Sequence, residues 1–142
     1  MKLATLRTGF GTSAIRIDGD NVGVELDYED VGQLLRSEDW RKAAQLSGEP
    51  VVFDHADLEA VVPAPGKVIC VGLNYAKHIR EMGREFPKHP TLFIKFAEAL
   101  TGPYDDVFIP EYGTQQLDYE GELAVIIGER AHHVSRDEAL DY

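Results

Sequence analysis

The sequence is poor in cysteine, in positive charge and in long apolar runs. Its one cysteine, Cys70, excludes an intrachain disulfide, and the apolar stretch VICVG around it indicates a buried neutral thiol rather than a nucleophile. The 14 Lys and Arg residues against 25 Asp and Glu give a net charge of −11, which disfavours nucleic acid and anionic membranes as partners because both would repel the protein. No apolar run approaches the roughly 20 residues that span a bilayer, and the N-terminus has no signal-peptide core. These absences predict a cytoplasmic protein.

A folded core is nevertheless expected, because hydrophobic residues make up 44% of the 142 positions. Short alternating runs over residues 1–28, with a Gly-Asp-Asn turn at 19–21, predict a small antiparallel sheet. The periodicity of residues 30–46 predicts two short helices, the second with Ser37 as its N-cap. Residues 61–67, VVPAPGK, contain two prolines and a glycine and predict a linker.

The linker suggests a small N-terminal α+β domain over residues 1–60 and a second domain over residues 61–142. In the second domain Asn74 is expected to cap a helix that stops at Gly83. The elements expected there are strands at residues 67–72, 91–95, 107–109 and 116–127, a helix over residues 75–82, and a helix that begins at Ser135. The predicted fold class is therefore mixed α+β, mainly β.

The acidic stretch LDYEGELAVIIG places Asp118, Glu120 and Glu122 at every second position. On a strand, their carboxylates would share one face at spacings of roughly 6 to 7 Å. One interpretation is a half-exposed strand with an acidic solvent face. The alternative is a bound divalent cation, which would offset the repulsion between neighbouring like charges. Hard oxygen ligands with no cysteine or adjacent histidine favour Mg²⁺, Mn²⁺ or Ca²⁺ over zinc.

The stretch NYAKHIREMG places His78 and Glu81 one helical turn apart, where they can hydrogen-bond and orient the imidazole. The alternative is a surface helix with incidental charges. The charged loop 84–90, with two prolines, is placed to fold over this helix as a lid. Lys95 ends the apolar run LFIK, and it either lines a site or extends to water, as strand-end lysines normally do.

Together, these segments resemble the fumarylacetoacetate hydrolase family. The matching strings are VICVGLNYAKHIREMG, the Pro-x-x-Pro-x-x-Phe-x-Lys pattern that ends at Lys95, TGPYDDVFIP, LDYEGELAVIIG and VSRDEALDY. They cover residues 64–142 almost continuously. The N-terminal part looks like the small variable domain that precedes the catalytic domain in bacterial members. The resemblance implies a catalytic β-roll, incomplete in this chain, and a homodimer.

The resemblance also implies roles for individual residues. Glu120 and Glu122 match the metal-binding Glu-x-Glu pair of the family. The implied catalytic residues are the dyad His78 and Glu81, together with Lys95, which lines the site. Family members act on 2-oxo acids and their enols with Mg²⁺ or a similar ion. A 2-oxo carboxylate can chelate such an ion with two oxygens, which stabilises the enolate that develops during reaction.

The implied function is a divalent-metal-dependent enzyme for small 2-oxo or 2-hydroxy-dienoic acids. An isomerase or decarboxylase resembling 2-hydroxyhepta-2,4-diene-1,7-dioate isomerase suits the layout of the chain best. The alternative within this class is an acylpyruvate or fumarylpyruvate hydrolase that cleaves a C–C bond, in which His78 activates water.

The third metal carboxylate of the family, an aspartate, lies downstream of the Glu-x-Glu pair, and this chain ends before it; Asp118 matches a family acid that is not usually a ligand. Two carboxylates would hold Mg²⁺ poorly. The chain is therefore expected to be an N-terminal fragment, or to be completed by another chain that supplies the missing C-terminal portion of the fold. The rival from another class is a non-catalytic binding module that pairs through an open sheet edge.

Overall fold

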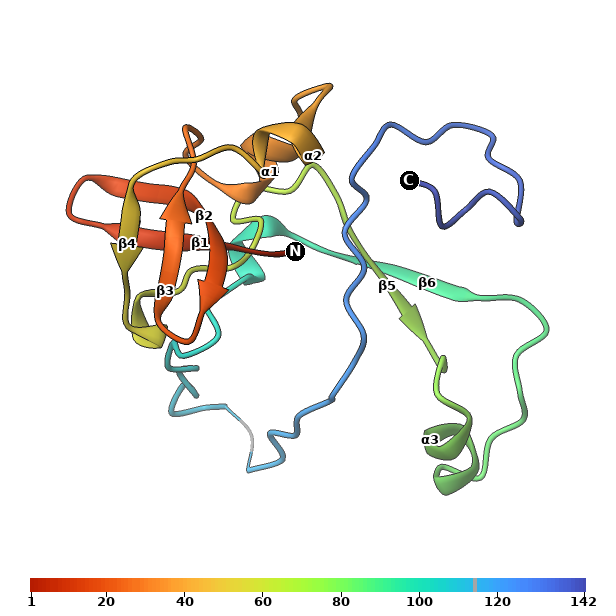
Figure 1. Ribbon diagram of the computed structural model, residues 1–142. Helices are drawn as coiled ribbons and strands as arrows, with labels where there is room; N and C mark the ends of the chain where they lie inside the picture. The colour runs from red at the N-terminus through yellow and green to blue at the C-terminus, as the bar shows by residue number, and fades with distance from the viewer. Residues whose placement is uncertain (114) are drawn as a thin grey trace.

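The computed structural model describes residues 1–113 and 115–142 (Figure 1). It contains two antiparallel sheets. The first sheet consists of β1 (Lys2–Thr8), β2 (Gly11–Gly19), β3 (Val22–Glu25) and β4 (Pro50–Val52), in that order, and the second pairs β5 (Val68–Gly72) with β6 (Thr91–Lys95). The helices are α1 (Val31–Leu35), α2 (Trp40–Ala43) and α3 (Ala76–Glu81), with 3-10 turns η1 (His55–Asp57) and η2 (Ala97–Ala99). The mixed, mainly β class is confirmed, but both sheets are open, so these strands do not close a β-roll.

The N-terminal sheet is buried on both faces. Ala14 and Ile15 are neighbours on β2, both are fully buried, and successive strand residues point to opposite faces. Ala14 packs with Leu34 in the cluster beneath the helices, whereas Ile15 packs with Phe53 in a second cluster. The predicted turn between β2 and β3 is confirmed, and Asn21 adopts the left-handed conformation there with a φ of 62°. This part of the molecule therefore has a core of its own.

The helix ends differ from the prediction in their capping residues. Helix α1 begins after Asp30, whose carboxylate accepts a hydrogen bond from the Gln33 amide at 2.7 Å. Ser37 was expected to cap α2, but the N-cap is Asp39. The prediction for Ser37 was wrong because its carbonyl instead accepts from the Trp40 amide at 3.2 Å, in a turn that precedes the helix.

The β5–β6 hairpin projects away from the N-terminal sheet, with α3 beyond its far end (Figure 1). Both strands and α3 were predicted at these positions, and the helix stops before Gly83, whose φ of 64° is the left-handed conformation typical of a helix end. Asn74 was the expected N-cap, but Tyr75 occupies that position because it is the last extended residue, with φ −108° and ψ 115°. Apolar side chains of the hairpin lie largely in solvent, including Ile69, Leu92 and Ile94.

The expected strands at residues 107–109 and 116–127 are absent from the described part of the chain, and the helix expected from Ser135 is a series of turns. A strand needs a neighbouring strand to satisfy its backbone N–H and C=O groups. In the described part of the chain, β5 and β6 pair only with each other, so residues 116–127 have no strand beside which to form a ladder. The local signal at Ser135 is nevertheless present, because its hydroxyl donates to the Glu138 carboxylate at 2.6 Å.

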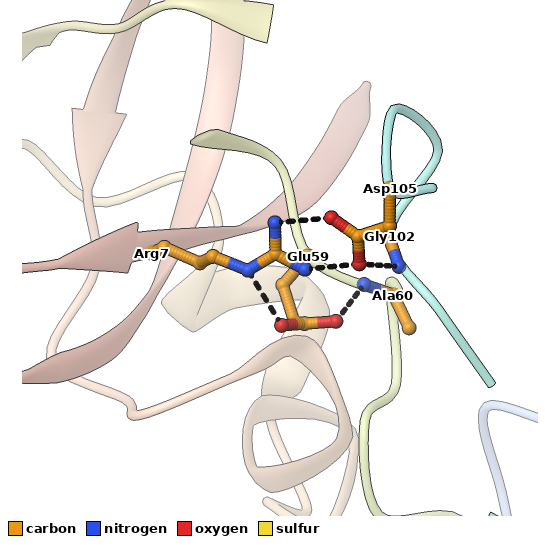
Figure 2. Close-up of polar contacts among 5 residues, drawn as sticks. All are labelled: Arg7, Glu59, Ala60, Gly102 and Asp105. Atoms are coloured by element: carbon orange, nitrogen blue, oxygen red, sulfur yellow. Dashed lines mark hydrogen bonds and ion pairs between the residues drawn. The ribbon is translucent and has the colours of Figure 1, made fainter. Parts of the chain in front are cut away.

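An ion-pair network joins β1 to residues 102–105 (Figure 2). The Arg7 guanidinium donates from Nε to Glu59 at 2.8 Å and from Nη1 and Nη2 to both oxygens of Asp105, at 2.7 and 2.6 Å. The Asp105 carboxylate also accepts from the Gly102 amide at 2.7 Å. A Cβ added to Gly102 would lie 2.5 Å from the Leu58 carbonyl oxygen, so the close approach of these segments requires glycine.

This network makes the stability of the fold depend on pH. Hydrogen bonds from Arg7 hold the pKa of Asp105 below its usual value, with the Gly102 amide as a second cause, and they lower the pKa of Glu59 in the same way. A carboxyl group whose pKa is lower in the folded state stabilises the fold, and its full contribution is present at pH values above the ordinary carboxyl pKa of about 4. This contribution is lost as the pH falls through the lowered pKa that the group has in the folded state.

Arg7→Ala is therefore expected to lower the free energy of unfolding at about pH 7 and to flatten its decline toward about pH 3. Urea unfolding followed by the fluorescence of Trp40, the single tryptophan, measures both quantities. Lys77→Ala is the control, since Lys77 is 91% exposed and its pair with Glu81 spans 3.8 Å. An unchanged pH slope in Arg7→Ala would contradict the role assigned to the network.

Candidate active site

The structure brings His78 to the acidic stretch. His78 lies in the middle of α3, and its Nε2 is 3.8 Å from Oε1 of Glu120. The two side chains are 50% and 71% exposed, so the pair is accessible to a small molecule. Two of the predicted site residues, 42 positions apart in the sequence, thus come together although residues 116–127 form no strand in the described chain.

The predicted hydrogen bond between His78 and Glu81 is not formed. Glu81 lies 3.8 Å from Nζ of Lys77, four residues earlier on the same exposed face of α3. The imidazole lies instead near Glu120, at 3.8 Å, which is beyond hydrogen-bond distance. The catalytic roles of His78 and Glu81 stay predictions.

The backbone of the acidic stretch is tied to the same helix. The Leu123 amide donates to the Tyr75 hydroxyl at 2.6 Å. Further along, Arg41 pairs with Glu129, and a Cβ added to Gly128 would lie 3.3 Å from the Trp40 ring. The stretch therefore runs from α3 to the N-terminal sheet and its helices.

Glu122 and Lys95 are not brought to His78. The Glu122 side chain makes no hydrogen bond or ion pair within the part of the chain that the structure describes. Lys95 ends β6 opposite Val68, and its Nζ lies 5.9 Å from the centre of the Phe93 ring. This position matches the alternative in which the lysine extends to water.

A shallow cleft of about 260 Å³ lies between α3 and the loop expected to act as a lid. Its walls include Ala76 and Ile79 of α3 and residues 86–90 of the loop. The Arg80 guanidinium lies 5.3 Å from the centre of the Phe86 ring, which helps to hold the loop beside the helix. The loop thus lies alongside α3, and its role as a lid stays a prediction.

The candidate metal ligands are of the right chemical type for a divalent cation, but there are too few of them. Carboxylate oxygens of Glu120 and Glu122 are the ligands that Mg²⁺ and Mn²⁺ prefer. Over residues 1–113 and 115–142, however, no three His, Cys, Asp or Glu side chains lie close enough together to hold a metal ion. A metal ion at Glu120 and Glu122 would therefore need further ligands beyond these two carboxylates.

The family model described as fumarylacetoacetate hydrolase, C-terminal, matches residues 67–142. The chain belongs to the fumarylacetoacetate hydrolase family. The match contains α3, the cleft and the whole acidic stretch. The resemblance inferred from the motif strings is thereby confirmed.

Among curated members of the family, the mitochondrial oxaloacetate tautomerase FAHD2A of Bos taurus is 47% identical over 81 residues, which are 57% of this chain and 26% of the relative. A fumarylacetoacetate hydrolase domain-containing protein 2 homolog from Dictyostelium discoideum is 46% identical over 113 residues, 77% of this chain and 36% of the relative. The chain thus spans about a third or less of these relatives.

A crystal structure of an HpcE candidate from Mycobacterium smegmatis matches with a TM-score of 0.62 at 27% identity. The match covers 78% of this chain and 41% of that one. It therefore extends beyond the 76 residues matched by the family model into the N-terminal sheet or the segment that follows it.

No helix in the described part of the chain is long and apolar enough to cross a membrane.

Proposed function

We propose that this member of the fumarylacetoacetate hydrolase family is an isomerase that interconverts the keto and enol forms of a small 2-oxo acid, with a divalent cation as cofactor. The observation that carries the proposal is the approach of His78 Nε2 to Glu120, the first carboxylate of the Glu-x-Glu pair. Support for the reaction type comes from relatives named as oxaloacetate tautomerases, which are 40 to 47% identical over the aligned residues.

In this reaction neutral His78 takes a proton from C3 of the substrate. The electron pair of the C–H bond forms the C2–C3 double bond, the C2 carbonyl pair moves to oxygen, and a proton is returned to that oxygen. A divalent cation bound at Glu120 and Glu122 would withdraw charge from the oxygens of the 2-oxo acid. Glu81, which lies beside Lys77, would orient His78 if its side chain rotated toward the imidazole, and the loop at residues 84–90 would exclude water.

The exposed apolar side chains of the hairpin support a further part of the proposal. An isolated two-stranded hairpin is marginally stable in water, and Leu92 and Ile94 on β6 are 63% and 66% exposed. We propose that the remaining strands of the same fold cover this surface and supply the missing metal ligand. A homodimer and a cytoplasmic location complete the proposal.

The test is the rate at which the full protein interconverts enol and keto oxaloacetate, followed by ultraviolet absorbance. We expect Mg²⁺-dependent catalysis that chelation with EDTA abolishes and added Mg²⁺ restores. Acetylpyruvate is assayed in parallel, and cleavage of its C–C bond without tautomerase activity would favour the hydrolase. A rate equal to that of buffer, with no affinity for Mg²⁺ or Mn²⁺, would favour the binding module.

A further inference from the structure

The Tyr75 hydroxyl makes a long-range contact that the proposed reaction does not use. It accepts a hydrogen bond from the Leu123 amide at 2.6 Å, across 48 positions of sequence. Tyr75 is the N-cap of α3, but its side chain makes no capping hydrogen bond to the helix. The Tyr75 side chain therefore contacts the acidic stretch and does not cap its own helix.

Two contacts with matching spacing join α3 to the acidic stretch. Tyr75, the N-cap, and His78 are three residues apart, and the side chains of both reach the acidic stretch. Their partners are also three residues apart, since His78 approaches Glu120 and Tyr75 binds the amide of Leu123. Two attachment points fix both the position and the direction of a segment, whereas the His78 contact alone, at 3.8 Å between exposed side chains, would fix neither.

The second attachment matters because the stretch has no strand ladder to hold it. Residues 117–127 form no helix or strand among the described residues. The Leu123 amide, which in a sheet would bond to a neighbouring strand, bonds to a side chain of the helix that carries the proposed general base. The anchored Leu123 amide lies directly after Glu122 and three residues after Glu120, so it restrains the backbone that carries the Glu-x-Glu pair.

We infer that Tyr75 is a positioning residue, whose hydroxyl holds the Glu120–Leu123 segment in register with His78. The inference deepens the proposed function and rests on it for the consequence in turnover. Tyr75 touches neither the reacting atoms nor the metal carboxylates in this role. Loss of its hydroxyl therefore misplaces the carboxylates relative to the imidazole without removing a ligand or a proton carrier.

The test is Tyr75→Phe in the full protein, with Tyr119→Phe as the matched control. Tyr119 lies in the same stretch and is 91% exposed, and its backbone, not its hydroxyl, makes the one hydrogen bond found for it within the described chain. Amide hydrogen exchange of Leu123, followed by NMR, reports on the contact itself. We expect exchange to accelerate roughly tenfold in Tyr75→Phe and to stay unchanged in Tyr119→Phe, in line with the loss of one hydrogen bond.

Turnover separates positioning from general stability. We expect kcat for oxaloacetate to fall roughly tenfold in Tyr75→Phe. We expect KM and the Kd for Mn²⁺ to stay within about twofold of wild type, since the ligands and the substrate contacts remain. Unchanged exchange at Leu123 would overturn the contact, and faster exchange with unchanged kcat would overturn the positioning role. An inactive wild type would refute the proposed function instead, and the exchange of Leu123 would still decide whether Tyr75 holds the segment.

Discussion

Replacing Glu120 or Glu122 with glutamine is expected to abolish metal-dependent turnover of oxaloacetate. The amide keeps the size of the side chain but removes the negative charge that binds a hard cation. Mutation of outer-shell groups around a metal typically costs roughly 10- to 100-fold in affinity or activity, so loss of a direct ligand should cost about 100-fold or more. Isothermal titration with Mn²⁺ and the tautomerase assay measure the two losses on the same preparations.

Asp118→Asn is the matched control for these variants. It makes the same chemical change two residues before Glu120 in the same stretch, and the proposed metal site does not use Asp118. Its carboxylate accepts a hydrogen bond from the Tyr119 amide at 2.9 Å, which is a local contact. We expect Asp118→Asn to keep Mn²⁺ affinity and turnover within about threefold of wild type. Wild-type Mn²⁺ affinity and turnover in both Glu120→Gln and Glu122→Gln would refute the metal assignment.

The parts of the fold that were predictable are those specified by local sequence. The turn at Asn21 and the helix stop at Gly83 require left-handed backbone conformations, which Asn and Gly adopt more readily than other residues. The hairpin strands were recognisable as short apolar runs bounded by turn residues. Each of these features depends on a few neighbouring residues and not on the rest of the structure.

The acidic stretch shows the limit of local patterns. Its alternation of Asp118, Glu120 and Glu122 is compatible with a strand, but a strand also needs a partner, and none is present beside residues 116–127 in the described chain. Asp, Glu and Gly also have low strand propensity. The pattern therefore assigned the backbone of these residues wrongly, and their part in a metal site stays a prediction.

Long-range partners were the features that the sequence did not reveal. Helical spacing assigned Glu81 to His78, whereas Glu120, distant in sequence, lies beside the imidazole. The network of Arg7 with Glu59 and Asp105 joins residues up to 98 positions apart, and nothing near Arg7 in the sequence indicates it. Such contacts depend on how separate elements pack, which spacing along one element does not encode.

Replacing His78 with alanine is expected to reduce turnover by roughly 100-fold or more while leaving Mn²⁺ affinity within about twofold of wild type. The magnitude follows from the usual contribution of a positioned general acid or base, roughly 10²- to 10⁴-fold. Metal affinity should persist because the Glu120 carboxylate is not the substituted group and its contact with the exposed His78 side chain is a weak one. The combination distinguishes a proton carrier from a ligand, since loss of a ligand lowers both quantities.

His132→Ala is the control for the general effect of removing an imidazole. The His132 ring packs edge-on against that of His133, with 4.1 Å between their centres, and His132 is not one of the residues assigned to the site. We expect this variant to retain wild-type turnover. Wild-type turnover in His78→Ala would remove the imidazole from the mechanism, and a parallel loss of Mn²⁺ binding would make His78 a metal ligand. Only loss of turnover with metal binding retained supports proton transfer by His78, because that reaction needs the imidazole at the metal site without needing it to hold the metal.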